Sequence, residues 1–337
     1  SLTLENGDSV LAAAAMSGNL ELVNWLIEQG IPLTDCTDTR SPLIEASRHQ
    51  HVDVVRRLVE LKVPLDAVDI SGSTALNQAC RNNFTEGAKI LLNAGADPTI
   101  PSSVFNDPLT NAASNNNVEL LSLITQKGVH LNRKGSGSYL ALLEAVEHGH
   151  IDAAKFLLEN GAPVLFQATR SSDKRPPPLI LALLAHTPRG EQFDILLPLL
   201  LEHGAPIHDV DEKGNDALMV ATMKRCRLST HLLIQHGAIV GQRNAAGKNA
   251  LDIAIQIMEM TLGTTDANAA MITEIFLFVS RRAMQQGNWL TLRYLALAAT
   301  RNRMIRELLP NVDPQCIQWV DNNLPLDRKS TRLNSSH

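Results

Sequence analysis

Leucine residues recur along the chain at nearly equal spacing, and an alanine follows each of them three residues later. The leucines are Leu11, Leu43, Leu76, Leu109, Leu142, Leu179, Leu218 and Leu251. The first five are 32 or 33 residues apart, and the later ones are 33 to 39 residues apart. A hydrophobic pattern with such a period indicates a repeat architecture, in which each unit buries its apolar face against its neighbours. We call each leucine the reference leucine of its repeat and count positions from it.

The third repeat shows the plan of one unit most clearly. A turn at residues 69–72 precedes a short helix that opens at Thr74. Asn83 and Phe84 break that helix, and a second helix ends at Gly95, because a helix C-terminus favours a residue that adopts a left-handed conformation. In the second helices, apolar residues at +11, +12, +15 and +16 line one face. Each repeat is therefore predicted to be a turn, a short helix, a tight link and a longer helix.

This pattern resembles the ankyrin repeat over about residues 5–255. The motifs that carry the resemblance are Ser41-Pro42-Leu43, Asp69-x-x-Gly72, Thr74-Ala75-Leu76, Gly95-Ala96-Asp97-Pro98 and Asp211-x-x-Gly214. TPR repeats have a similar length but lack the Asp-x-x-Gly turn, and HEAT and armadillo periods are longer. The resemblance implies an all-α fold, an α-solenoid of about eight ankyrin-like helix-turn-helix repeats with short hairpin turns. Ankyrin repeats usually carry a hydrogen-bonding histidine at +1, and this chain has none there. We therefore expect apolar contacts to carry more of the coupling between repeats.

The repeat pattern divides the chain into three parts. Residues 1–255 form the array, with loop insertions at 167–178 and 186–192. Residues 256–327 are predicted to be a helical C-terminal cap, or a decayed ninth repeat, because an open solenoid end exposes an apolar face that must be covered. Residues 328–337 are polar and without periodicity, and we interpret them as a non-native or disordered tail.

Composition narrows the class of protein. The hydrophobic fraction of 44% indicates a globular chain, and the net charge of -5 argues against a chain that binds nucleic acid along its whole length. The four cysteines show no zinc-ligand spacing, so we expect a reducing, cytoplasmic location. We find neither a signal-peptide pattern nor an apolar run long enough for a membrane span.

Candidate chemistry is sparse in the sequence. His148-Gly149-His150, followed by Asp152, is the nearest approach to a metal-ligand cluster, but its glycine falls at the link between the two helices of a repeat. Motifs of zinc peptidases, phosphate-binding loops and nucleophile elbows do not occur. We therefore expect a protein that is not an enzyme, with no catalytic residues, no metal, no cofactor and no small-molecule substrate.

The predicted function is protein–protein interaction on the concave face that an ankyrin-like stack presents. The template leaves the turn residues and the positions +5 and +6 free to vary, as in a surface that selects its own partner. The candidate protein-binding residues are Arg40, Arg48, His49, Arg81, Asn82, Asn115, Tyr139, Glu147, His148, Glu212, Lys213, Met223 and Lys224. Among them, the arginines and His49 of the first three repeats are predicted to form a basic patch.

We expect a self-contained, monomeric scaffold, and two alternatives stay open. In the first, the chain is the recognition arm of a larger enzyme or effector whose catalytic domain lies outside this sequence. A weaker hypothesis assigns binding of nucleic acid or an anionic membrane to the arginine-rich cap, which includes Arg301 and Arg303. A solvated helix face is the simpler interpretation of those arginines.

Overall fold

The computed structural model describes residues 9–33, 41–102, 107–131, 137–164, 176–185, 192–261 and 269–286. Contacts divide the chain into two compact units, residues 1–169 (unit 1) and 170–337 (unit 2). The described residues form sixteen helices and no strand longer than an isolated bridge. The predicted all-α repeat fold is therefore confirmed in each unit.

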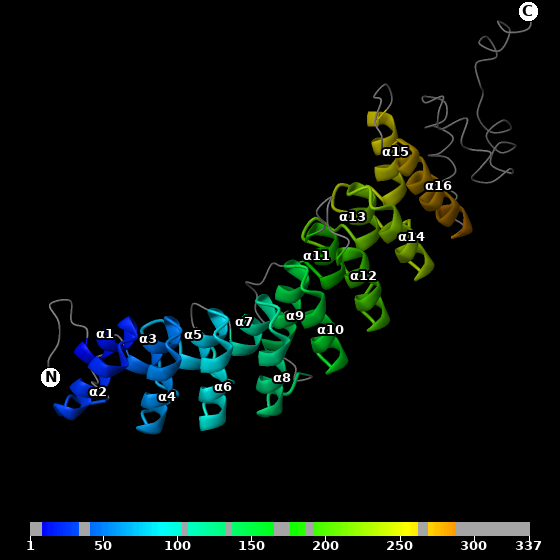
Figure 1. Ribbon diagram of the computed structural model, residues 1–337. Helices are drawn as coiled ribbons and strands as arrows, with labels where there is room; N and C mark the ends of the chain where they lie inside the picture. Colours follow the sequence, from blue (N-terminus) through cyan, green and yellow to red (C-terminus); the bar gives the residue numbers. More distant parts are fainter. Residues whose placement is uncertain are drawn as a thin grey trace, which may run out of the picture. The chain divides into compact units, whose positions relative to one another are not determined.

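Unit 1 contains five helix pairs in two rows (Figure 1). The first helices are α1 (Val10–Ser17), α3 (Pro42–Arg48), α5 (Ala75–Arg81), α7 (Pro108–Ser114) and α9 (Gly137–Glu147). The second helices are α2 (Leu20–Glu28), α4 (Val52–Glu60), α6 (Thr85–Ala94), α8 (Val118–Gln126) and α10 (Ile151–Glu159). Each first helix packs against the first helix of the next repeat, and each second helix does the same in its own row.

Unit 2 continues the same plan with three pairs. Its first helices are α11 (Pro178–Ala185), α13 (Ala217–Met223) and α15 (Ala250–Thr261), and its second helices are α12 (Gln192–Glu202), α14 (Arg227–Gln235) and α16 (Ala269–Gln285). Helix α16 packs on α14 and α15, so it takes the place of the second helix of the eighth repeat. Most of both predicted insertions, the rest of the predicted cap and the tail at 328–337 lie outside the described residues.

The reference leucines form the core of every repeat. All eight are at most 2% exposed, and the alanines at +3 are at most 3% exposed. Each buried leucine contributes about 1.5–3 kcal/mol relative to an exposed one. Alanine at +3 lets neighbouring first helices approach closely, which explains why a chain with few aromatic residues can pack this way.

The link between the two helices of a repeat has a left-handed backbone whichever residue stands there. Gly18 and Gly149 adopt it, and so do Asn83 and Arg225, with φ of 54° and 59°. A side chain in this region costs about 1–2 kcal/mol, so the repeat stack rather than local preference determines the conformation.

Hydrogen bonds between repeats lie mainly at these links. The Asn82 side chain donates to the carbonyl oxygen of Arg48 at 2.9 Å, and the Asn115 side chain donates to that of Cys80 at 3.0 Å. The His150 ring nitrogen Nε2 lies 2.9 Å from the carbonyl oxygen of Ser114 and is the donor, because a carbonyl only accepts. Polar coupling between repeats is thus stronger than the missing +1 histidines suggested: it uses amides and imidazoles at +6 and +8, and at +1 the Asn77 amide donates to the carbonyl oxygen of Ile100 at 3.0 Å.

Candidate functional site

The ends of the first helices and the turns before them hold the side chains that vary most between repeats. At +5, the five first helices of unit 1 carry Met16, Arg48, Arg81, Ser114 and Glu147. The buried leucines and alanines below fix the helix backbone, so these side chains project from a rigid base. Such a surface recognises a partner by shape and charge without moving elements.

Arg48 is engaged inside the array. Its guanidinium donates from Nη1 to Glu45 Oε1 and from Nη2 to Asp69 Oδ2, both at 2.9 Å. The Glu45 side chain is 2% exposed, while that of Arg48 is 34% exposed. Because Glu45 belongs to the second repeat and Asp69 to the turn of the third, Arg48 connects the two repeats and two carboxylates balance its charge.

The carboxyl group of Asp69 organises the turn that precedes α5. Its Oδ1 accepts hydrogen bonds from the Ser71 hydroxyl at 2.6 Å and from the backbone N–H groups of Ser71 and Ser73, each at 2.9 Å. Burial raises the pKa of Asp69, but these donors and the charge of Arg48 outweigh it, and the pKa is lowered overall. Asp69 therefore stays ionised and anchors the turn.

The residues at +6 are also engaged by the fold. Asn82 and Asn115 donate to carbonyl oxygens of the preceding repeat. His49 lies 3.7 Å from the buried Glu45 and stacks on the ring of His51 with 6.3 Å between ring centroids. These side chains keep exposed edges, but their positions are set by contacts within the array.

Among the predicted binding residues at +5 in unit 1, Arg81 and Glu147 are exposed. His148 is also exposed, and its ring stacks on His150 at 5.7 Å between centroids. Arg40 lies outside the described residues, and Tyr139 lies on α9 in a part whose side chains are not described. Of the arginines in the predicted basic patch, Arg48 is balanced by two carboxylates and Arg81 is exposed, so the patch as a whole stays a prediction.

The candidates of unit 2 lie on one turn and on the end of α13. Glu212 and Lys213 are exposed in the turn before α13, and Met223 and Lys224 are exposed where that helix ends. The structure adds Leu184 at +5 on α11, an exposed apolar residue that the candidate set omitted. The +5 position of Leu184 was enough to predict its exposure, because counting five residues from the reference leucine also selected Met223.

The described residues offer little catalytic chemistry. They contain no group of three or more His, Cys, Asp or Glu side chains placed to hold a metal ion. Burial, with a smaller effect of Asp107, raises the pKa of the Cys80 thiol to about 12, so this cysteine is not a nucleophile near neutral pH. In the part of the chain that the structure covers, no helix combines the length and apolar character that crossing a membrane requires.

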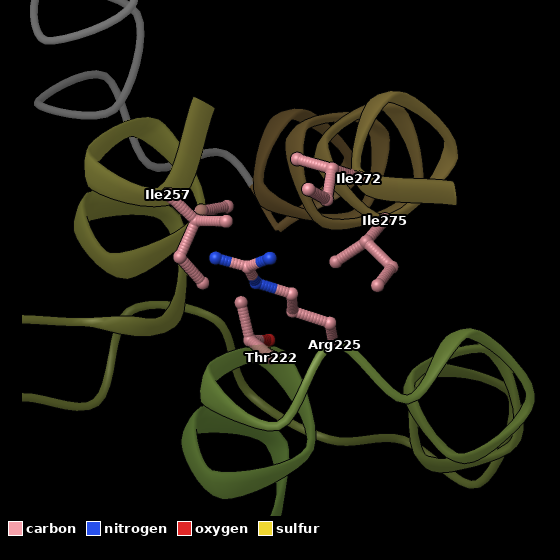
Figure 2. A pocket seen from close by; sticks show the side chains of 6 residues that line it. Thr222, Arg225, Ile257, Ile272 and Ile275 are labelled. Carbon is pink, nitrogen blue, oxygen red and sulfur yellow. The ribbon is translucent and has the colours of Figure 1, made fainter. Parts of the chain in front are cut away.

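Helices α13, α15 and α16 enclose a narrow pocket in unit 2 (Figure 2). The guanidinium of Arg225 points into it between Ile257 of α15 and the pair Ile272 and Ile275 of α16. Thr222 also lines the pocket, but its hydroxyl donates to the carbonyl oxygen of Leu218 at 2.7 Å. Both polar groups are thus engaged within the chain and the other walls are aliphatic, so we assign this pocket to packing.

Comparison with known proteins identifies the repeat. The family described as "Ankyrin repeats (3 copies)" matches residues 10–102 and 103–168. The "Ankyrin repeat and KH domain-containing protein mask-1" of Caenorhabditis elegans is 25% identical over 297 residues, which are 78% of this chain, and the chain spans 11% of that relative. The human ASB11 ankyrin repeat domain matches with a TM-score of 0.55 and 24% identity, over 70% of this chain and 98% of that domain. The ankyrin repeat protein EF0377 matches with a TM-score of 0.50 and 30% identity, over 57% of this chain and 96% of that protein.

Proposed function

The chain belongs to the ankyrin-repeat family, and from that premise we propose that it is a scaffold that binds a protein partner on its turns and first-helix ends. The observation that carries the proposal is the contrast between framework and surface. Positions 0 and +3 are buried and are leucine and alanine in all eight repeats, whereas +5 is exposed or half-buried and holds apolar, basic, polar and acidic residues along the array.

The proposed binding residues in unit 1 are Arg81, Glu147 and His148, and those in unit 2 are Lys213, Met223 and Lys224. Contacts between neighbouring repeats engage the other candidates of unit 1, and these residues fix the position of the surface: Arg48, Asn82 and Asn115. Arginine and methionine are favoured in protein interfaces, which supports Arg81 as a binding residue of unit 1 and Met223 as one of unit 2.

We further propose that the protein acts as a monomer, without catalysis, in a reducing, cytoplasmic compartment. Cys80 is a buried free thiol, which supports that compartment. The alternative of a recognition arm within a longer protein is supported by the small share of mask-1 that the chain spans. Sequencing of the full transcript separates the two alternatives.

Site-specific photo-crosslinking tests the proposed surface. A photoreactive amino acid replaces Arg81, Glu147 or Met223 in the full chain, and matched control chains carry it at Lys127 or Glu159, which are exposed near the ends of second helices. The partner captured from cell extract should crosslink at the first three positions and not at the two controls. Crosslinking confined to the control positions would reject the proposed surface.

A further inference from the structure

Exposed apolar side chains occupy the +5 position in two successive first helices of unit 2. They are Leu184 and Met223, and the third +5 residue of this unit is the polar Gln256. In unit 1, Met16 is apolar and exposed, and the other +5 residues are charged or polar. The +2 residues are buried or half-buried in both units, so the difference between the two surfaces rests on +5.

The exposed apolar side chains of unit 2 follow one another across its three first helices. Leu184 on α11 and Met223 on α13 are each 42% exposed, and Met260 on α15 is 66% exposed. Helices α11, α13 and α15 pack in that order. Met260 lies one helical turn after the +5 residue of its own helix, on the same side of α15. We call Leu184, Met223 and Met260 the apolar stripe.

The unpaired charges beside α13 are positive, whereas the exposed Glu259 precedes Met260 on α15. Lys213 and Lys224 are exposed, and neither forms an ion pair with a residue that the structure describes. The carboxylates close to these lysines are used internally: Asp211 accepts from the backbone of Lys213 and Asn215, and Asp216 accepts from the backbone of Met219 at the start of α13. Glu212 has an interaction of its own within the chain.

From this combination we infer that the apolar stripe binds an acidic amphipathic helix of the partner protein. The inference rests on the proposed function and names the chemistry of the partner for unit 2. Adjacent packed helices are about 8–10 Å apart, and seven residues of a helix rise about 10.5 Å, so apolar residues at i and i+7 match successive first helices. Acidic residues beside that face pair with Lys213 and Lys224.

A helical partner fits this surface better than an extended one. The stripe consists of side chains on helices α11, α13 and α15, whose backbone groups are already hydrogen-bonded within each helix. An extended segment would find no strand edge there and would leave its own N–H and C=O groups unpaired against apolar side chains. A helical partner satisfies its backbone N–H and C=O groups by hydrogen bonds within the helix.

Binding of synthetic peptides to the full chain tests the inference. The probe is a fluorescein-labelled 18-residue helix-forming peptide with leucine at i, i+3, i+4 and i+7 positions and glutamate beside that face. One control peptide replaces every glutamate by lysine, and another scrambles the leucine spacing at constant composition. Fluorescence anisotropy should show at least tenfold tighter binding of the glutamate peptide than of either control, with a difference that shrinks as salt screens the charges.

Variants of the full chain locate the binding. Met223→Glu and the double variant Lys213→Glu/Lys224→Glu should each weaken binding of the glutamate peptide at least tenfold, whereas Lys127→Glu, an exposed position in unit 1, should leave it unchanged. Far-UV circular dichroism verifies that each variant is folded, which is expected because the three altered positions of unit 2 are exposed. Equal binding of the glutamate and lysine peptides, or unchanged binding to Met223→Glu, would overturn the inference.

Failure of this inference is distinguishable from failure of the proposed function. If the glutamate peptide does not bind but the natural partner still crosslinks at Arg81 and Glu147, the scaffold function stands and the assignment to the apolar stripe falls. Vesicles that contain phosphatidylserine provide a further arm. Vesicle binding that Met223→Glu abolishes, without peptide binding, would show a membrane contact instead and would also overturn the inference.

Discussion

Replacement of Arg48 by alanine separates a structural role from a binding role for this residue. In the folded chain its guanidinium bridges Glu45 and Asp69 at 2.9 Å on each side. Arg48→Ala leaves the Glu45 carboxylate buried, with the His49 ring 3.7 Å away. Asp69 is less affected, because the Ser71 and Ser73 donors remain.

The expected loss of stability from Arg48→Ala lies between the losses from breaking a buried and an exposed ion pair. Removal of one partner of a fully buried pair costs about 3–5 kcal/mol, and an exposed pair contributes about 0–1 kcal/mol. The Glu45 side chain is 2% exposed and that of Arg48 is 34% exposed, so water reaches one side of the pair only. We therefore expect Arg48→Ala to lower the free energy of unfolding by about 2 kcal/mol.

Urea unfolding followed by far-UV circular dichroism measures this change. The double variant Glu45→Gln/Arg48→Ala should recover about half of the loss or more, because it removes the buried charge as well. Arg56→Ala is the matched control, since Arg56 is exposed on α4 and forms no ion pair with a described residue. If Arg48→Ala is as mild as Arg56→Ala, and Glu45→Gln gives no recovery, the ion pair does not stabilise the array and Arg48 returns to the binding residues.

Three further predictions concern the framework. Gly18→Ala should destabilise the chain by at least about 1 kcal/mol more than Gly30→Ala in urea unfolding: both residues have positive φ, but the new Cβ would lie 2.4 Å from the His51 ring in the first case and meets no atom within 4 Å in the second. Iodoacetamide at pH 8 should leave Cys80 unmodified until urea unfolds the chain, as peptide mass spectrometry reports; modification in the native chain would contradict the burial that raises the pKa of its thiol to about 12. Burial also raises the pKa of the Asp216 carboxyl, so its ionised form opposes folding and the penalty grows as pH rises above the unfolded value near 4. Asp216→Thr, which uses the N-cap residue type of α5, should therefore lose less stability than the parent chain between pH 4 and pH 7, and parallel pH profiles would contradict this.

Periodicity predicted the fold well because it reports burial directly. A leucine with an alanine at +3 is buried in every repeat, so counting from Leu76 or Leu218 located each helix pair. The binding positions were harder to predict, because exposure depends on which neighbour stacks on a side chain. Glu45 and Arg48 are three residues apart and their pairing could be read locally, but Asp69 joins them only through the stacking of the third repeat on the second.

The contacts of the link residues could not be predicted either, because they also depend on how the repeats stack. Asn82 and Asn115 look like free polar surface in the sequence, and the carbonyl oxygens that they contact belong to the preceding repeat. The absence of histidine at +1 correctly indicated a changed network but could not show where the replacement lies. The exposure of Leu184 and Met223, by contrast, could be predicted from their +5 position alone.

Hydrogen–deuterium exchange of the complex with the natural partner tests the central claim most directly. The account predicts that binding slows exchange at the ends of the first helices and the links that follow, at residues 81–83, 147–149 and 223–225. Exchange at the ends of the second helices, at residues 126–128 and 159–161, should be unchanged. Protection confined to the second-helix ends, with none at the first-helix ends, would contradict the proposal that this protein binds its partner through turns and first helices.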